Sequence, residues 1–201
     1  MLRLDQAMVE RGLSDSRERA KRAILAGQVR VNSQLAHKPS DAVTPSDEII
    51  LAAGEKFVSR GGYKLEHALD SFHLDVTGLV AIDVGASTGG FTDCLLQRGA
   101  QKVFAVDVGR GQLAWKLRQD KRVVVMEKTN ARYLKPGQLP QSPDLAVIDC
   151  SFISLRKILP PTIALLKTEG KIVALVKPQF EAGKAEADKG RGVIRDPLVH
   201  E

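Results

Sequence analysis

A run of small residues directly follows a short apolar stretch in the sequence LVAIDVGASTGGF, residues 79–91. Residues 79–82 predict a buried parallel strand that ends at Asp83, and a helical pattern begins at Phe91. Small residues between a strand and a helix let a ligand approach free backbone N–H groups at the helix N-terminus. The spacing differs from the G-x-G-x-x-G of dinucleotide-binding proteins. The acid at Asp83 would repel a pyrophosphate but suits a cationic methionine group.

The spacing of this glycine-rich turn resembles the first motif of S-adenosylmethionine-dependent methyltransferases. S-adenosylmethionine is therefore the expected cofactor, and the alternative is a turn that only packs a helix on a sheet. Asp107 closes a second predicted strand, where a carboxylate can accept hydrogen bonds from ribose hydroxyls. Asn130 can bond an adenine edge, although an ordinary Asx turn explains it equally well. The predicted cofactor-binding residues are Asp83, Gly85, Ala86, Ser87, Gly89, Gly90, Phe91, Asp107, Val108, Asn130 and Ala131.

Asp149 lies at the end of another predicted strand and is followed directly by Cys150. Methyltransferases of exocyclic amines carry a proline pair with an aromatic residue here, and cytosine-C5 enzymes place a cysteine after a proline. This sequence has neither pattern, so Cys150 is interpreted as a small buried residue. Two lysines remain around Asp149, namely Lys64 and Lys177. Two lysines and an acid suit removal of a proton from a weakly acidic hydroxyl.

The role of Lys177 stays open between two alternatives. A free lysine titrates near ~10.4, and lowering its pKa by about three units costs roughly 4 kcal/mol. Burial, Lys64 and a sulfonium charge favour that lowering, whereas Asp149 opposes it. Alternatively the lysines only orient the hydroxyl, and orientation alone can supply ~7–11 kcal/mol.

Five apolar segments predict the strands that position these groups. Helical patterns alternate with them, which predicts an α/β fold with a parallel, doubly wound sheet. Ligands of such sheets bind at the carboxyl ends of the strands, where this sequence places polar side chains that packing does not explain. The predicted strands are 79–83, 102–107, 122–126, 144–149 and 171–177.

Residues 1–58 differ from the rest of the chain in their pattern of predicted elements. Apolar spacing predicts a helix that ends at Gly12 and a basic helix that ends near Ala26, followed by strands at 29–31 and 48–51. A basic helix with small strands can contact phosphates, although charge alone favours a solvated helix face. The predicted domains are 1–58, a small α+β unit that includes a linker, and 59–201, the α/β sheet domain.

Composition limits the class of protein. The net charge of +6 suggests a polyanionic partner, and 43% hydrophobic residues is typical of a globular chain. Cys94 and Cys150 lack metal-ligand spacing and fit a reducing compartment, so no metal is expected. No apolar run approaches the ~18 residues of a membrane span, and no signal sequence begins the chain. We expect a cytoplasmic protein without a membrane partner.

The pattern R-L-D…A…V-x-x-G-L-x-x-S-R…A…I-x-x-G-x-V-x-V-N over residues 1–51 resembles the small RNA-binding domain first known from ribosomal protein S4. This resemblance implies that basic side chains of the segment face RNA. The expected RNA-binding residues are Arg3, Arg17, Lys21 and Arg22.

Motifs throughout the chain resemble the TlyA family. They are SRGGYKLEHAL, DVGASTGGFTDCLL, AVDVG, DLAVIDCSFISL, LVKPQFEAGK and KGRGVIRD. The family consists of ribosomal RNA 2′-O-ribose methyltransferases, also described as haemolysin-like, with an S4-like N-terminus and an FtsJ-like, Rossmann-like catalytic domain. The resemblance implies an enzyme that acts on ribosomal RNA or ribosomal subunits. The family has a catalytic Lys-Asp-Lys-Glu tetrad. The resemblance implies that its first three members correspond to Lys64, Asp149 and Lys177.

The tetrad glutamate of the family falls beyond residue 201, because Glu181 is too near Lys177 and Glu201 ends the chain. A new helix is predicted from Pro197, and the family's last strands are absent, so we expect a C-terminally truncated sheet domain. The alternative function is a catalytically inactive RNA-binding protein that keeps the methyltransferase fold. A haemolysin needs membrane spans or a strongly amphipathic segment, and the sequence shows neither.

Overall fold

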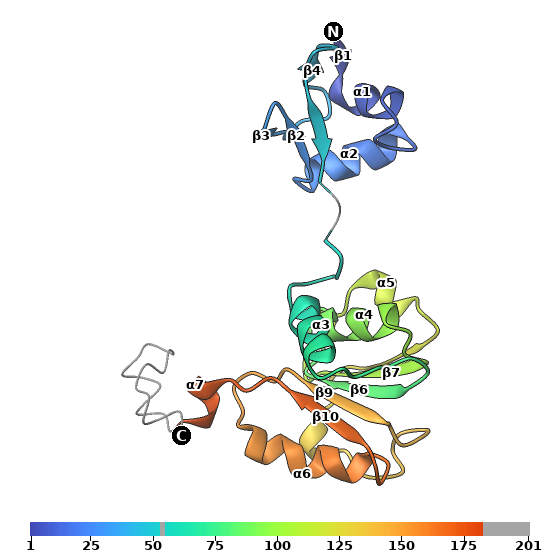
Figure 1. Cartoon of the computed structure of the whole chain (residues 1–201), viewed down its shortest axis with the longest axis vertical. Helices are drawn as coiled ribbons and strands as arrows, with labels where there is room; N and C mark the ends of the chain where they lie inside the picture. The colour runs from blue at the N-terminus through green and yellow to red at the C-terminus, as the bar shows by residue number, and fades with distance from the viewer. Residues whose placement is uncertain (53–54, 183–201) are drawn as a thin grey trace. The chain divides into compact units, whose positions relative to one another are not determined.

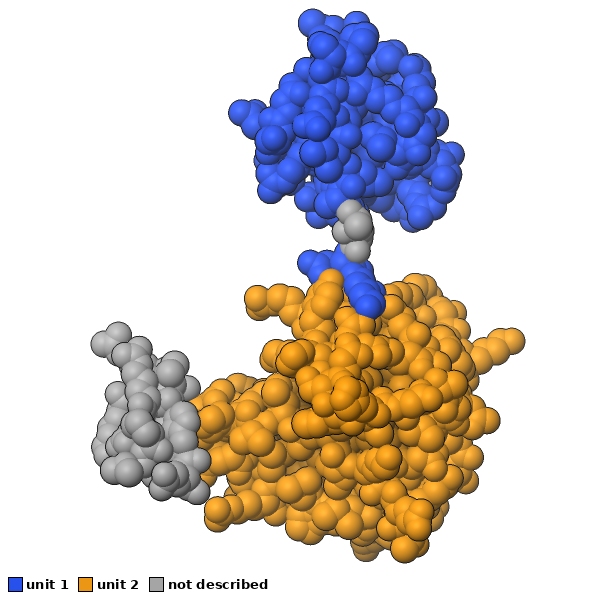
Figure 2. All heavy atoms as spheres, in the orientation of Figure 1, with its two compact units in different colours: residues 1–56 blue, residues 57–201 orange. Residues whose placement is uncertain are grey.

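The computed structural model describes residues 1–52 and 55–182. The chain divides into two compact units, Met1–Lys56 and Phe57–Glu201 (Figure 2). Phe57 is buried in the core of the second unit, two residues before the predicted domain start at residue 59. The linker residue Gly54, the KGRGVIRD motif at 189–196 and the predicted helix from Pro197 lie outside the described residues.

The first unit contains the two predicted helices and short antiparallel strands. Ser16 caps the second helix by accepting a hydrogen bond from the Arg19 N–H, and Gly27 follows that helix with φ +70°. One sheet has the order β3-β2-β5, and β1 pairs with β4. Three strands of this unit, β1, β3 and β4, are only two residues long, which is too short for an alternating pattern to reveal them. The elements are β1 Leu2–Arg3, α1 Leu4–Glu10, α2 Arg17–Leu25, β2 Val29–Val31, β3 Gln34–Leu35, β4 Ala42–Val43 and β5 Ile49–Leu51.

The second unit is built on a five-stranded parallel sheet, which confirms the predicted fold class (Figure 1). All five predicted strands are present, in the order β10-β9-β6-β7-β8. The strands are β6 Val80–Val84, β7 Lys102–Val106, β8 Val123–Met126, β9 Leu145–Ile148 and β10 Lys171–Ala174. The helices are α3 Gly61–Ser71, α4 Gly90–Gln97, α5 Trp115–Arg118, the 3₁₀ helix η1 Ala131–Tyr133, α6 Leu155–Leu165 and α7 Pro178–Glu181.

Alternating strand residues pack on the two faces of this sheet. Ala81, Val103 and Val147 face α3, α4 and α5, whereas Ile82, Phe104 and Ile148 face α6 and η1 (Figure 1). The two layers bury both faces, which explains the continuously apolar strands.

The crossover from β8 to β9 differs from the expected alternation of strands and helices. Within this described segment only the three-residue η1 is helical. Residues 134–143 contain Pro136, Pro140 and Pro143 together with Gly137. Proline lacks the N–H that a helix interior needs, and glycine is a poor helix former, so these residues oppose an α-helix here.

The chain order reverses across the sheet beside β6. From β6 the chain builds outward through β7 and β8, then returns to β9 on the other side of β6. Ligands of doubly wound sheets bind at this switch point, beyond the carboxyl ends of the strands. In this unit the switch point lies between the ends of β6 and β9. Among residues 1–52 and 55–182, no helix is both long and apolar enough to cross a membrane.

Candidate active site

The glycine-rich turn after β6 brings two strand ends into close contact. Gly85 has φ +88°, and a Cβ added there would lie 2.8 Å from the carbonyl oxygen of Asp149. The N–H groups of Gly85 and Ala86 both donate to the carbonyl of Val106, the last residue of β7. Gly89 caps α4 with φ +96°, and a Cβ there would lie 2.3 Å from Leu117 Cδ1. The glycines at 85 and 89 are therefore required by backbone conformation and by space.

Asp83 lies behind this turn. Its carboxylate is fully buried, and Oδ2 accepts hydrogen bonds from the Thr92 N–H at 2.9 Å and the Thr92 hydroxyl at 2.7 Å. Burial raises the pKa of Asp83 to about 7, and Asp149 and Asp107 add to the increase. Asp83 and Gly89 line neither of the two cavities at the turn, unlike the other predicted cofactor-binding residues.

One cavity, of about 420 Å³, extends from the turn to the end of β7. Asp107 lies on its wall, where Oδ2 accepts from the Ser87 N–H at 2.8 Å and Oδ1 from the Gly109 N–H at 2.7 Å. Asn130 lies on another wall and forms the Asx turn considered above, since its Oδ1 accepts from the Arg132 N–H. Six of the predicted cofactor-binding residues therefore line this one cavity, whose size is typical for small ligands. They are Gly85, Ser87, Asp107, Val108, Asn130 and Ala131.

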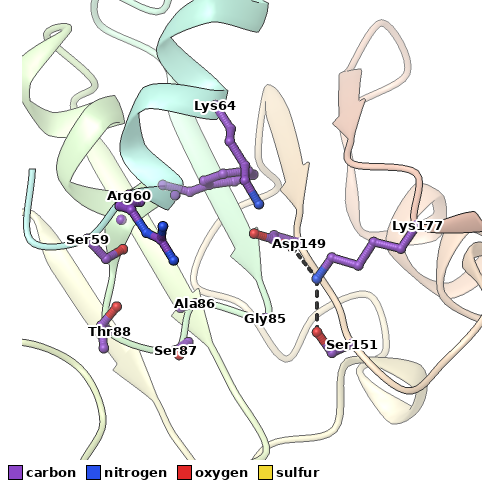
Figure 3. Close-up of a pocket in the computed structure, with 13 residues that line it drawn as sticks. Ser59, Arg60, Lys64, Gly85, Ala86, Ser87, Thr88, Asp149, Ser151 and Lys177 are labelled. Atoms are coloured by element: carbon purple, nitrogen blue, oxygen red, sulfur yellow. Dashed lines mark hydrogen bonds and ion pairs between the residues drawn. The ribbon is translucent and has the colours of Figure 1, made fainter. Parts of the chain in front are cut away.

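A second cavity, of about 600 Å³, adjoins the first and contains the predicted catalytic residues (Figure 3). The Lys177 ammonium lies 2.5 Å from Asp149 Oδ1 and donates to Ser151 Oγ at 2.9 Å. Lys64 extends from α3 toward Asp149 from the opposite side (Figure 3). The two cavities share Gly85, Ser87, Asp149 and Ser151. Residues predicted from three distant motifs therefore meet beside the glycine turn.

The expectation that Cys150 is a small buried residue holds only in part, because this residue also lines the first cavity. It is half-buried, and its thiol donates to the Val84 carbonyl at 3.5 Å. Burial raises the pKa of the Cys150 thiol to about 11, with a further contribution from Asp83. The thiolate is the nucleophilic form of cysteine, so this environment keeps the side chain unreactive near neutral pH.

Several lining residues were not predicted from the sequence. Ser151 follows Asp149 by two positions, and a polar residue just beyond a strand end was the available signal. Gln112 accepts a hydrogen bond from the Ser87 hydroxyl at 3.2 Å, and nothing in its local sequence indicated this. The second cavity also includes Ser59, Arg60, Gly61 and Thr88.

The predicted RNA-binding residues of the first unit fall into separate groups. Arg3 and Arg17 both donate to the buried carboxylate of Asp5, at 3.1 and 3.2 Å. Burial opposes ionisation of Asp5, but hydrogen bonds from the two arginines outweigh it and lower its pKa. Lys21 pairs with Glu18 at 2.7 Å, and Arg22 lines a separate cavity. No group of His, Cys, Asp or Glu side chains in the described parts of the chain is arranged to hold a metal ion.

The comparisons with known proteins agree in both units. Residues 57–201 match the FtsJ-like methyltransferase model, and residues 2–49 match the S4 domain model. The putative rRNA methyltransferase YqxC of Bacillus subtilis is 52% identical, and the alignment covers 98% of this chain and 71% of that protein.

Two further relatives carry related descriptions. The 16S/23S rRNA (cytidine-2′-O)-methyltransferase TlyA of Mycobacterium tuberculosis is 48% identical, over 98% of this chain and 74% of that protein. The solved structure of a putative hemolysin from Streptococcus thermophilus is 49% identical, with a TM-score of 0.70 over 98% of this chain and 73% of that chain.

Proposed function

We propose a function from the premise that this chain belongs to the TlyA family of FtsJ-like methyltransferases, with an N-terminal S4 domain. Its activity is S-adenosylmethionine-dependent 2′-O-methylation of ribosomal RNA, with cytidine as the modified nucleoside. The observation that carries this proposal is the convergence of Lys64, Asp149 and Lys177 beside the glycine turn. The relatives named above come from bacteria, in which ribosomes are assembled in the cytoplasm, so we propose that the reaction takes place there.

The turn and the first cavity fit an adenosine-bearing cofactor. S-adenosylmethionine supplies an electrophilic methyl group on a sulfonium centre when bound. Asp107 and Asn130 would hold the adenosine, since a carboxylate and an amide suit ribose hydroxyls and an adenine edge. Backbone around Gly85 and Ser87, where side chains are small or absent, leaves space for the methionine part toward the second cavity.

Replacing Asp107 with alanine should weaken S-adenosylmethionine binding about 100-fold. The change removes the expected bonds to the ribose and also releases the Ser87 and Gly109 N–H groups from Asp107. Two hydrogen bonds to a charged group contribute about 1.5 kcal/mol or more each. Calorimetry measures the affinity. Asp120→Ala, which removes a carboxylate bonded to Arg122, is the control and should bind normally; equal affinity in both variants contradicts the assignment.

The side chains of the second cavity suit a ribose hydroxyl. Asp149 holds the Lys177 ammonium in a fixed position, and Lys64 adds a second amine at the same point. An amine here can hold the 2′-oxygen in line with the methyl group, and a neutral amine can accept its proton. The ion pair with Asp149 orients the Lys177 amine in either of these two roles.

The S4 domain is proposed to bind ribosomal RNA through Arg3, Arg17, Lys21 and Arg22. The ion pairs with Asp5 leave both arginines about half exposed, which keeps their guanidinium groups available to phosphates. Affinity for ribosomal RNA should fall steeply as salt rises, and Arg17→Ala should reduce the slope of log affinity against log salt by about one. A filter-binding titration checks this. A slope that Arg17→Ala leaves unchanged contradicts a phosphate contact at this residue.

Methyl transfer to ribosomal subunits tests the proposed function as a whole. With radiolabelled S-adenosylmethionine and purified subunits, we expect label in ribosomal RNA and a block to alkaline cleavage beside the modified cytidine. Alkaline cleavage needs a free 2′-hydroxyl, so it separates ribose methylation from base methylation. Label on a base contradicts the proposed acceptor, and RNA binding without transfer favours the non-catalytic alternative.

A further inference from the structure

Glu181 connects the segment after β10 to the start of α6. Its Oε1 accepts a hydrogen bond from the Leu155 N–H and its Oε2 from the Ser154 hydroxyl, both at 2.7 Å. Ser154 is the N-cap of the eleven-residue α6. A carboxylate at this position satisfies a free N–H group of the helix and interacts favourably with its dipole. Both oxygens of Glu181 are therefore fixed by one helix end.

The segment that Glu181 fixes also carries Lys177. Lys177 is the N-cap of α7, and Glu181 is the last of the four residues of that helix. So short a helix has little stability of its own, because one helical turn does not offset the cost of nucleation. The strand ladder continues as far as the Leu175 N–H, which bonds the Ile148 carbonyl. Beyond that point, the position of Lys177 depends on contacts that its segment makes with other elements.

Three contacts join this segment to residues 149–155. Lys177 reaches Asp149 and Ser151 at one end. The Phe152 and Phe180 rings lie 5.3 Å apart in the middle. Glu181 bonds the helix end at the other through two hydrogen bonds to its carboxylate, and hydrogen bonds to a charged group are stronger than neutral ones.

We propose that Glu181 is a positioning residue, which holds the α7 segment on the N-terminus of α6 and so fixes the Lys177 amine against Asp149. This inference rests on the proposed function for its effect on methyl transfer, but not for its effect on Lys177 itself. Without Glu181, Lys177 keeps its chemistry and loses its fixed position. A displacement of about 1 Å at a reacting group can lower a rate roughly 100-fold.

The test combines a structural and a kinetic measurement on the whole chain. Brief acetylation with acetic anhydride, followed by mass spectrometry, reports the reactivity of Lys177. Lys167, which pairs with Asp144 before β9, is the internal reference. In Glu181→Ala, Lys177 should be acetylated several-fold faster while Lys167 is unchanged. The rate of methyl transfer should fall about 10- to 100-fold without a change in S-adenosylmethionine affinity, and it should fall no further when Glu181→Ala is added to Lys177→Ala.

Two variants keep the proposal testable. Glu181→Gln retains an acceptor for the Leu155 N–H and gains an amide that can donate to Ser154, but it loses the charge. It should therefore fall between the unmodified protein and Glu181→Ala in both measurements. Glu181→Asp retains the charge but is one methylene shorter, so it should raise Lys177 acetylation even where the alanine variant does not fold. The control Glu169→Ala, which removes an exposed glutamate in the turn before β10, should change neither measurement.

Unchanged Lys177 acetylation in folded Glu181→Ala or Glu181→Asp overturns the proposal. So does an additional loss of rate in the double variant, because Glu181 would then act independently of Lys177. Absence of methyl transfer by the unmodified protein counts against the proposed function alone, since the acetylation result still decides the position of Lys177.

Discussion

Replacing Lys177 with alanine is expected to lower the rate of methyl transfer about 10²- to 10⁴-fold while S-adenosylmethionine still binds. The side chain ends between Asp149 and Ser151 in the second cavity, away from the wall that holds Asp107 and Asn130. Its removal therefore leaves the glycine turn and the expected adenosine contacts in place. Single-turnover transfer to ribosomal subunits measures the rate, and calorimetry measures cofactor affinity.

Lys167 provides a matched control for this experiment. It forms an ion pair with Asp144 at 2.6 Å, so it resembles the Lys177–Asp149 pair in chemistry. Asp144 directly precedes β9, whereas Asp149 directly follows it, so the two pairs lie at opposite edges of the sheet. Lys167→Ala should leave the rate unchanged. Near-normal 2′-O-methylation by Lys177→Ala contradicts a catalytic role, and equal losses in both variants indicate a general effect on folding.

Lys177→Arg separates the two roles left open for this residue. A guanidinium keeps the pair with Asp149 but does not lose its proton in proteins. If Lys177 only orients the hydroxyl, the arginine variant should keep part of the activity and its pH–rate profile should match that of the unmodified protein. If Lys177 accepts the proton, the arginine variant should resemble alanine and lose the ascending limb of the profile.

The sheet could be predicted because each of its strands is an apolar run bounded by turn residues. Val80–Val84 and Leu145–Ile148 are buried on both faces, and their short length and β-branched residues separate such runs from a buried helix segment. Polar residues at the strand ends then located the site, since parallel strands bring those ends to one edge. This logic identified Asp107, Asn130 and Asp149 as residues at one edge of the sheet.

The direction of a buried side chain could not be predicted in the same way. Asp83 lies in a strand whose side chains alternate between faces, and it points to the N-terminus of α4 rather than into a cavity. The sequence places it next to the turn but does not show that Thr92, nine residues later, occupies its oxygen. Likewise the bond between Glu181 and α6 joins residues 26 apart, a pairing that no local pattern reveals.

Asp83 should make the stability of the second unit depend on pH in the opposite sense to an ordinary ion-paired carboxylate. Its pKa is raised from 3.8 to about 7 in the folded state, chiefly by burial. The folded protein therefore binds this proton more tightly than the unfolded chain does. The contribution of Asp83 to the free energy of unfolding is greatest below the unfolded pKa of 3.8, and it is lost as pH rises through 7. Between pH 5 and pH 8 the loss approaches two pKa units, or roughly 3 kcal/mol.

Asp83→Asn should remove that dependence. The asparagine Oδ1 can still accept from both Thr92 groups, and its amide carries no charge to be desolvated. A buried amide without a partner lowers stability by about 1–3 kcal/mol, but by the same amount at every pH. In the unmodified protein, Asp83 should lower the free energy of unfolding, measured with urea, as pH rises from 5 to 8. In Asp83→Asn the change over this interval should lack that contribution of about 2–3 kcal/mol.

The control for this experiment is Asp120→Asn. Hydrogen bonds from Arg122 lower the pKa of Asp120, so this group is ionised in both the folded and unfolded states throughout that interval. Its replacement should shift stability equally at pH 5 and pH 8, because proton uptake on unfolding is then the same. Parallel pH dependence in Asp83→Asn and the unmodified protein would show that Asp83 is ionised when buried, and its contacts with Thr92 would then have to compensate for the lost hydration of the charge.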